Sequence, residues 1–414
     1  MEAPTDTRIA GRPLVGRSVA FWGMSATLGL LLFASSTPSP LYVVYQREWG
    51  FSDITLTSVF AVYALALLAS LVFAGSVSDQ IGRRPAIRFA LIIEIATMVL
   101  FAEARDVGWL FAARIAQGVA TGIGMGAISA ALIDLQPADS PRRGALMGAV
   151  APLTGLAIGA LGAGLLIEYG PDPTHFVFWL LAGAFALCLL FVAAIPDPVD
   201  GVPLRVGMLR PNVEVPPALR VAFLATLPCL IAVWALGGLV LSLGGSLTAG
   251  VIGDDSHLVG GLPIFVMAGV SAIMSVRLRN AHARATARGG LAALVAGLAV
   301  VLLGLQVGSI AIFLLGTAIA GLGFGPAFAG AFRALSNQAP LDRRASFVSS
   351  ILVVSYLAFS LPAVLAGAAV TQLGLHDTAD IYGIALIVLA ATALPLSGQL
   401  RDPQSEVAAQ PATA

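Results

Sequence analysis

Hydrophobic residues along this chain form long uninterrupted runs, separated by short charged stretches. A helix that crosses a bilayer needs about 20 mostly apolar residues. Eight runs of that length contain no charged residue: 18–46, 54–78, 144–167, 173–196, 221–253, 256–276, 345–376 and 381–400. A longer charge-free run, 289–332, predicts two helices joined by a turn near Gly308, and the runs 89–104 and 107–133 predict two more that contain Glu94 and Arg114. The pattern predicts twelve membrane-spanning helices, because alternating barrel strands are absent and only helices or closed barrels satisfy the backbone in lipid.

The composition excludes several classes of protein. Of 414 residues, 58% are hydrophobic and 11% are charged, which excludes both a soluble globular protein and a disordered chain. The formal net charge is zero, which argues against a nucleic-acid partner. No nucleophile–base constellation or nucleotide-binding fingerprint is found, and four histidines stand without metal-ligand spacing: His175, His257, His282 and His376. We therefore expect no enzyme activity, no metal and no cofactor, with the lipid bilayer as the surroundings.

The arginines predict how the chain crosses the membrane. With the N-terminus in the cytoplasm, 19 arginines fall in cytoplasmic segments and only Arg47 and Arg105 fall outside, in line with the positive-inside rule. Both termini are therefore predicted to be cytoplasmic. We expect a multi-pass, monomeric protein of a bacterial inner membrane.

The longest predicted cytoplasmic connection divides the chain into two halves. The predicted organisation is a cytoplasmic N-terminal tail (1–17), a six-helix bundle (18–196), a proline-rich linker (197–219), a second six-helix bundle (220–400) and a C-terminal tail expected to be disordered (401–414). The halves also repeat at an offset of 201 residues: Gly122-Ile123-Gly124 matches Gly323-Phe324-Gly325, and Arg142-Arg143 matches Arg343-Arg344. Parallel repeats place a substrate cavity between the halves, near the middle of the membrane.

The loop between the second and third predicted helices carries the pattern G-x-x-x-D-x-x-G-R-R, formed by Gly75, Asp79, Gly82, Arg83 and Arg84. In this position of a twelve-helix chain, the pattern resembles the signature loop of the major facilitator superfamily, although Gln80 stands where a basic residue is common. The resemblance covers the whole chain through its helix number, its division into six and six, and its orientation. It implies an all-α membrane protein of two pseudo-symmetric six-helix bundles.

The resemblance also implies a cytoplasmic gate in this loop. In the superfamily the aspartate, here Asp79, faces the start of the eleventh helix, where a helix N-terminus stabilises a carboxylate. Arg83 is expected to pair with an acid at the end of the fourth helix, and Asp134 matches that position. The plainer interpretation is that Arg83 and Arg84 only set the topology.

The predicted helix 107–133 carries a second resemblance. Arg114-Ile115-Ala116-Gln117-Gly118 resembles the R-x-x-Q-G signature of twelve-helix drug:proton antiporters, in which this helix lines the cavity. An arginine roughly 10 Å inside the membrane is costly unless it is paired or wetted, and Glu94 is the only acid well inside a span. In one interpretation Glu94 takes up a proton and releases Arg114 toward the cavity. In the other, the two residues form a static buried bridge.

Two further sets of residues complete the candidate sites. The predicted helix 144–167 has a stripe of small residues on one face, which helix packing explains, although it also partly matches a glycine-rich stretch of the antiporters: Gly148, Gly155, Gly159 and Gly162. Since charges within the spans are scarce, the cavity is expected to be mostly apolar, with aromatic candidates for its lining: Tyr63, Trp234, Phe324, Phe328 and Tyr356.

The sequence therefore predicts a secondary transporter that works by alternating access. The first hypothesis is the export of small apolar or amphiphilic molecules in exchange for protons. The second is a proton-coupled symporter or facilitator that imports a sugar or another small metabolite. A third, of another class, is a transport-dead membrane receptor or scaffold.

Overall fold

The computed structural model describes residues 15–74, 81–172, 174–195, 213–253, 256–340 and 342–399, which contain helices and no β-strand. Twelve segments among them are long and apolar enough to cross a membrane, which confirms the predicted number, and α1 and α2 together form the first. The helices are α1 (Arg17–Ser36), α2 (Pro38–Trp49), α3 (Asp53–Ala74), α5 (Arg83–Ala102), α6 (Val107–Leu135), α7 (Arg143–Tyr169), α8 (Phe176–Ala194), α9 (Arg220–Leu247), α10 (His257–Arg277), α11 (Ala283–Gln306), α12 (Ile310–Ser336), α13 (Arg344–Leu373) and α14 (Leu375–Leu396).

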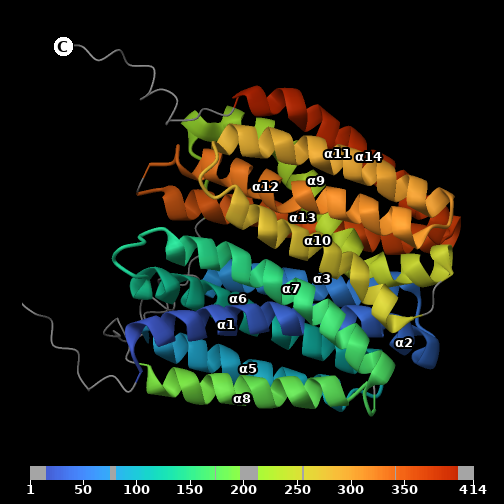
Figure 1. Cartoon of the computed structure of the whole chain (residues 1–414), viewed down its shortest axis with the longest axis horizontal. Coiled ribbons are helices and arrows are strands. Elements are labelled where there is room, and N and C mark those ends of the chain that lie inside the picture. The colour runs from blue at the N-terminus through green and yellow to red at the C-terminus, as the bar shows by residue number, and fades with distance from the viewer. Residues whose placement is uncertain are drawn as a thin grey trace, which may run out of the picture.

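The helices form two bundles that lie side by side (Figure 1). The first holds α1 to α8 and the second α9 to α14, so that each contains six membrane-spanning segments. Between the bundles, α7 packs against α10 and α3 packs against α13. The fold is thus the predicted all-α arrangement of two six-helix bundles.

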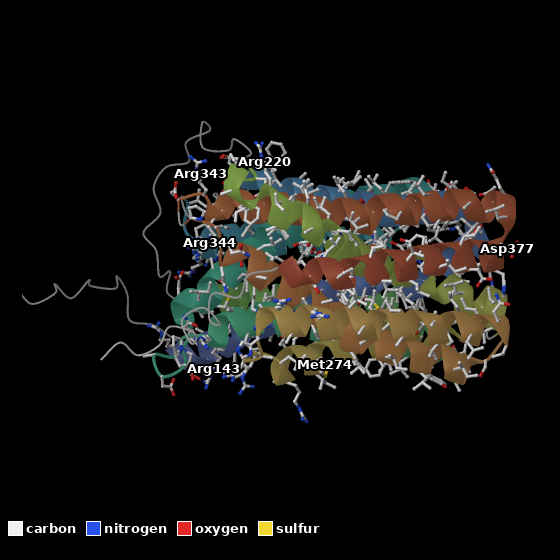
Figure 2. The ribbon with its side chains drawn as sticks, turned by 90° about the horizontal axis from the view of Figure 1, so that it is seen from above. Arg143, Arg220, Met274, Arg343, Arg344 and Asp377 are labelled. Carbon is white, nitrogen blue, oxygen red and sulfur yellow. The ribbon has the colours of Figure 1, made fainter. Side chains whose placement is uncertain are left out.

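Charged side chains separate the two ends of the molecule. Arg143, Arg220, Arg343 and Arg344 gather at one end, whereas Asp377 lies at the other (Figure 2). We call these the basic end and the opposite end. α1, α5, α7 and α13 begin at the basic end with an arginine, and α10 ends there with one.

The bundles touch most closely toward the opposite end. A side-chain Cβ added to Gly261 in α10 would lie 2.5 Å from the carbonyl oxygen of Ala160 in α7. A Cβ added to Gly367 in α13 would lie 2.8 Å from the carbonyl oxygen of Asp53 in α3. Glycine permits this contact because it has no side chain.

Arginines at the basic end bind the last carbonyls of neighbouring helices. Arg17 Nη2 donates to the Asp134 carbonyl at 2.6 Å and its Nε donates to the Leu135 carbonyl at 3.3 Å, at the end of α6. Arg84 donates to the Ala193 carbonyl near the end of α8. A cation is stabilised at a helix C-terminus, where carbonyl groups lack intrahelical donors. These arginines therefore hold helices together as well as marking one end of the molecule.

Several helix boundaries differ from the prediction, among them the starts of α5 and α11, each six residues before the predicted run. The run 18–46 is not one helix, because α1 ends at Ser36 and α2 begins at Pro38; a proline has no N–H to continue the hydrogen-bond ladder. The last helix begins at Leu375, six residues before the predicted start, because its first turns contain Asp377 and were excluded by a charge-free criterion. The predicted turn within 289–332 is confirmed, with Gly308 at φ +63° between α11 and α12.

The repeat between the halves is clear at one pair of helix starts. α7 begins at Arg143 and α13 at Arg344, and each is preceded by an arginine at the N-cap. The glycines matched in sequence do not occupy equivalent positions in the two bundles: Gly122 packs on α3, while Gly323 packs on α11. Gly325 packs on α10, the second helix of its half, and so takes the place that corresponds to Gly122.

The predicted limits of the two bundles, 18–196 and 220–400, stay predictions. The two terminal tails lie mostly outside the described residues, and so does the linker except for residues 213–219, which include a short 3-10 turn at Pro217–Leu219.

Candidate functional site

Arg114 is the centre of a buried polar network in the first bundle. Its side chain, on α6, is 1% exposed. Its Nε donates to the Tyr42 hydroxyl at 2.6 Å, and its Nη1 donates to the Ser35 carbonyl at 2.9 Å and to Gln117 Oε1 at 2.6 Å. Every one of these acceptors is neutral, so hydrogen bonds alone replace the water that the guanidinium would have bound.

Aromatic rings surround the same guanidinium. The Arg114 Cζ lies 5.3 Å from the ring centre of Tyr42, 5.1 Å from that of Tyr63 and 5.8 Å from that of Phe101. The face of an aromatic ring attracts a cation at these distances, most strongly where water is excluded. Tyr63 is itself held in place, because the Ser35 hydroxyl donates to its hydroxyl at 2.7 Å.

The break in the first span supplies part of this network. In an unbroken helix the carbonyl of Ala34 would accept from the residue four positions on, but that residue is Pro38, which has no N–H. Gln117 Nε2 donates to the Ala34 carbonyl instead, at 3.1 Å. The proline thus frees an acceptor at the point where α6 presents its polar side chains.

Glu94 lies in a separate part of the same bundle. It is 0% exposed on α5, and its Oε1 accepts a hydrogen bond from the Thr121 hydroxyl at 2.8 Å. Its Oε2 is also buried and has no hydrogen-bond partner among the described residues, like the hydroxyl of Thr97 one turn away. Within the described part of the chain, the carboxyl group is therefore hydrogen-bonded through one oxygen only.

The predicted contact between Glu94 and Arg114 is wrong. These two described residues form no ion pair, and Arg114 turns toward α1 and α2 instead. The depth estimate placed the two residues about 6 Å apart along the membrane normal. In the structure Glu94 is level with Thr121, which lies two turns along α6, or roughly 10 Å, from Arg114. Neither the static bridge nor a direct release of Arg114 by Glu94 describes this geometry.

The signature loop is described only in part. Gly75 and Asp79 lie outside the described residues. Gly82 precedes α5 with φ +97°, a conformation that favours glycine. Arg83 Nε lies 3.3 Å from Asp134 Oδ2 at the end of α6, so the structure brings this predicted pair together.

The aromatic candidates form a cluster that joins α9, α12 and α13. Trp234 is the central ring, with ring-centre distances of 5.3 Å to Phe328 and 4.9 Å to Tyr356. Phe359, which was not predicted, lies 5.6 Å from Trp234 and 4.9 Å from Phe60 of the other bundle. The indole N–H of Trp234 is buried and finds no acceptor within the described part of the chain. A cluster of four rings in the second bundle thus contacts the first bundle through Phe359 and Phe60.

Two candidates lie apart from the centre of this cluster. Phe324 stands beside Gly237, where an added Cβ would be 3.1 Å from its ring. Tyr63 belongs to the Arg114 network instead.

Three of the four predicted packing glycines lie against α1. A Cβ on Gly155 would collide with the carbonyl of Gly29, and one on Gly159 with the carbonyl of Phe33. Gly162 faces the Phe33 ring, 3.1 Å from an added Cβ. Gly148 differs, because an added Cβ would meet only the Ser129 hydroxyl at 4.0 Å, so its role in close packing is wrong.

A cavity of about 810 Å³ opens at the basic end, between α7 of the first bundle and α10 and α12 of the second. The bundles therefore part at this end, while they touch toward the opposite end. Sequence reasoning missed this cavity, because it treated the arginines around it only as topology signals. It also missed Tyr42 and Ser35, although Pro38 beside them was a signal for irregular backbone.

Comparisons with known proteins agree with this architecture. A sequence model described as the Major Facilitator Superfamily matches residues 24–363. Puromycin resistance protein pur8 of Streptomyces alboniger is 31% identical over 155 residues, which are 36% of this chain and 30% of that protein. Multidrug resistance protein MdtL of Shewanella oneidensis is 33% identical over 149 residues, 34% of this chain and 37% of that protein. The matched segments thus span about a third of the length of each relative.

Solved structures share the fold at low identity. A bacterial homologue of the human lysosomal transporter Spinster, inward-facing and unoccupied, superposes with a TM-score of 0.71 at 14% identity, covering 94% of this chain and 98% of that one. A peptide transporter in complex with alafosfalin superposes with a TM-score of 0.73 at 16% identity, covering 94% of this chain and 96% of that one.

Proposed function

This chain belongs to the major facilitator superfamily of transporters, and from that membership we propose that it exports small apolar or amphiphilic molecules in exchange for protons, by alternating access. The observation that carries the proposal is that the first bundle buries two ionisable groups, Arg114 and Glu94, each with its own hydrogen-bond partners. Arg114 is held by neutral groups, and one oxygen of Glu94 has no hydrogen-bond partner in the described part of the chain. A transporter that couples to protons needs a group whose charge changes inside the membrane at an affordable cost.

Glu94 is the proposed proton carrier. Burying a carboxylate with half of its hydrogen-bonding capacity unmet is costly, and that cost falls when a proton neutralises it. Thr121 connects Glu94 to α6, the helix that also carries Arg114 and Gln117. A change of charge on Glu94 therefore acts on α6 through one hydrogen bond, and through the Coulomb interaction with Arg114 rather than through direct contact.

Alternating access requires a gate at each end. We propose that the basic end faces the cytoplasm, with both termini there, in accordance with the positive-inside rule. The pairing of Arg83 with Asp134 then stabilises the cytoplasmic gate, and Asp79 is proposed as its latch to the second bundle. The membrane is proposed to be a bacterial inner membrane, and the working unit a monomer.

The names of the relatives support export. Pur8 and MdtL are described as resistance proteins, and so is quinidine resistance protein 1 of Saccharomyces cerevisiae, which is 26% identical over 175 residues, 42% of this chain and 29% of that protein. Resistance is commonly achieved by moving a compound out of the cell. The mostly apolar spans are suited to hydrophobic or amphiphilic compounds.

The experiment is transport by the full-length protein in proteoliposomes under an imposed pH gradient. We expect hydrophobic dyes to move against the proton flow, and Arg114→Ala to lose at least about 90% of this transport, since a buried aromatic cage without its cation no longer orders α1 and α6. Arg105→Ala, in the loop between α5 and α6, is the matched control. Gradient-driven accumulation of a sugar would support the symporter instead, and no transport from a broad panel would favour the receptor or scaffold.

A further inference from the structure

The cavity at the basic end has a chemical character that the proposed function does not specify. Four arginines line it, two from the start of α7 and two from the second bundle: Arg142, Arg143, Arg279 and Arg333. None of the residues that line it is acidic. The deeper part of its wall is apolar, with Leu146, Ala149 and Met274 one to two helical turns inside the arginines.

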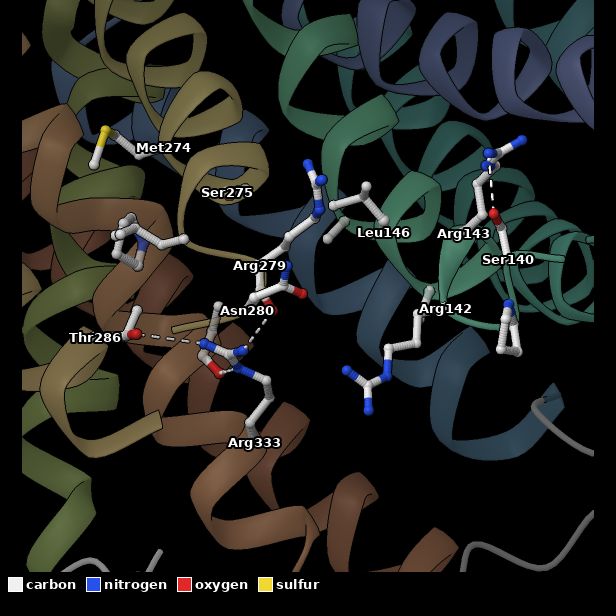
Figure 3. Close-up of a pocket in the computed structure, with 16 residues that line it drawn as sticks. Ser140, Arg142, Arg143, Leu146, Met274, Ser275, Arg279, Asn280, Thr286 and Arg333 are labelled. Atoms are coloured by element: carbon white, nitrogen blue, oxygen red, sulfur yellow. Dashed lines mark hydrogen bonds between the residues drawn. The ribbon is translucent and has the colours of Figure 1, made fainter. Parts of the chain in front are cut away.

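Two of the arginines face the cavity without a competing partner. The Arg142 side chain forms no hydrogen bond or ion pair with any described residue, and its guanidinium points into the space between the bundles (Figure 3). Among the described residues, the Arg279 side chain, just after the end of α10, donates only to the carbonyl of Val276 in the last turn of that helix, at 3.4 Å. Its guanidinium points across the cavity toward the first bundle, on the side of Leu146 (Figure 3).

The other two arginines are held by the protein. Arg143 donates to the Ser140 hydroxyl at 3.0 Å, and Arg333 donates to the Arg279 carbonyl at 3.2 Å and to the Thr286 hydroxyl at 3.5 Å. Arg333 therefore fixes the backbone that carries Arg279. Elsewhere at the same end, Arg17, Arg83 and Arg84 bind helix ends or Asp134. They differ in this from Arg142 and Arg279, whose side chains face the cavity.

We propose that this cavity binds an amphiphile with an anionic head group, a carboxylate or a phosphate. Arg142 of the first bundle and Arg279 of the second supply the positive charge that attracts the head group, and the apolar body lies against Leu146, Ala149 and Met274. Arginine suits this role because its planar guanidinium presents paired donors to the oxygens of a carboxylate or phosphate. The volume of about 810 Å³ is within the range of small-molecule sites.

This inference rests on the proposed function where transport is concerned. It names the class of exported compound as anionic amphiphiles that enter from the basic end. A bound anion that touches both bundles also changes their contact at this end. One ligand chemistry has two sources here, a transported compound and an anionic lipid of the surrounding leaflet.

The experiment measures binding of dansyl-labelled undecanoic acid to the full-length, delipidated protein in detergent, with the neutral methyl ester of the same probe for comparison. We expect the acid to bind more tightly than the ester, and its binding to weaken as salt is raised, since exposed charges are screened. The double variant Arg142→Gln and Arg279→Gln should weaken binding of the acid by about tenfold and leave binding of the ester unchanged. Arg288→Gln, an exposed arginine on α11 outside the cavity, is the matched control and should bind as the wild type does.

Equal binding of acid and ester, or equal loss in the control variant, would overturn the anionic site. Competition by phosphatidylglycerol but not by phosphatidylcholine supports the site and assigns a lipid as its occupant; export of the acid from proteoliposomes supports it and assigns a substrate. The two proposals fail separately. Export of neutral dyes without binding of the acid overturns only the anionic site, and arginine-dependent binding of the acid in a protein that moves no compound overturns only the export.

Discussion

At the scale of single residues, the first bundle holds a buried cation, Arg114, without pairing it directly with a buried anion. The Arg114 guanidinium donates three hydrogen bonds to neutral acceptors, and three aromatic rings surround it. Removing one member of a buried ion pair leaves the other charge uncompensated, and costs more than losing a neutral acceptor does. If Glu94 carries the proton, as proposed, a cage of neutral groups lets it gain and lose that proton without unfolding the Arg114 site.

The substitution Glu94→Gln tests this separation. Glutamine has the size of a protonated glutamate and still accepts the hydrogen bond from Thr121, so the variant should fold and bind substrate. It cannot carry a proton, so the component of transport that depends on the pH gradient should fall at least about tenfold, while exchange without a gradient persists. Flux in proteoliposomes with and without the gradient measures both.

Glu103→Gln is the matched control, because Glu103 is exposed directly after the same helix and should leave coupling unchanged. Full stimulation by the gradient in Glu94→Gln would rule out Glu94 as the carrier.

At the scale of helices, close approach is decided by where glycine meets a backbone. α1 and α7 cross at Gly155 and Gly159, where added side chains would collide with the carbonyls of Gly29 and Phe33. The close contact does not continue to Gly148, where an added Cβ would come within 4.0 Å only of the Ser129 hydroxyl on α6. The same spacing in the sequence thus produces contact at one level of the bundle and none at another.

Substituting Gly155→Ala should destabilise the protein, because the added methyl group has no room beside the Gly29 carbonyl and α1 and α7 must move apart. Overpacking of this kind typically costs about 1–3 kcal/mol. Melting of the purified protein in detergent, followed by tryptophan fluorescence, should show a lower transition temperature. Gly148→Ala places the same methyl group on the same helix in open space and should melt as the wild type does. Equal melting of the two variants would contradict the packing argument.

At the scale of the whole molecule, the two bundles are in contact toward the opposite end and apart at the basic end. In the proposed alternating-access cycle this asymmetry is reversible, so the contacts at the opposite end are expected to break in each cycle. The Ser256 hydroxyl, before α10, donates to Glu168 Oε2 of α7 at 3.4 Å and marks one such contact between the bundles.

A crosslink across this contact should stop transport. In a background of Cys188→Ala and Cys229→Ala, the pair Glu168→Cys and Ser256→Cys joined by a short bifunctional thiol reagent should reduce flux at least about tenfold, with recovery when a reducible reagent is cleaved. The physical reason is that the crosslink holds the bundles together where they must separate. Radiotracer flux in proteoliposomes is the measurement.

The control pair for this crosslink is Gln306→Cys and Asp380→Cys. These residues are hydrogen-bonded to each other within the second bundle, in α11 and α14, so joining them should leave transport intact. Unimpaired flux with Glu168 and Ser256 replaced and joined would show that the bundles do not separate at this end.

Most of the fold was predictable because membrane insertion depends on local properties. The length and apolarity of each run determine whether it spans, as for 107–133, which α6 matches within two residues at its end. The break at Pro38 and the early starts of α5, α11 and α14 were not predicted, because a count of charges ignores proline and ends a run at a charged side chain that a helix can still contain. The free-energy cost of burying an arginine in the membrane pointed to Arg114 from the sequence alone. The residues that bind Arg114 could not be predicted from the sequence.

The sequence by itself determined the number of spans, the division into two halves and the few charges that must be compensated inside the membrane. These follow from the energetics of transferring each segment into lipid, which depend on neighbouring residues in the chain. Only the tertiary structure decided that Arg114 turns to Tyr42 and Ser35, that Glu94 bonds to Thr121, and that Arg142 and Arg279 face one cavity. Those choices depend on the rotation and axial offset of helices against one another, which are determined by side-chain packing between segments distant in sequence.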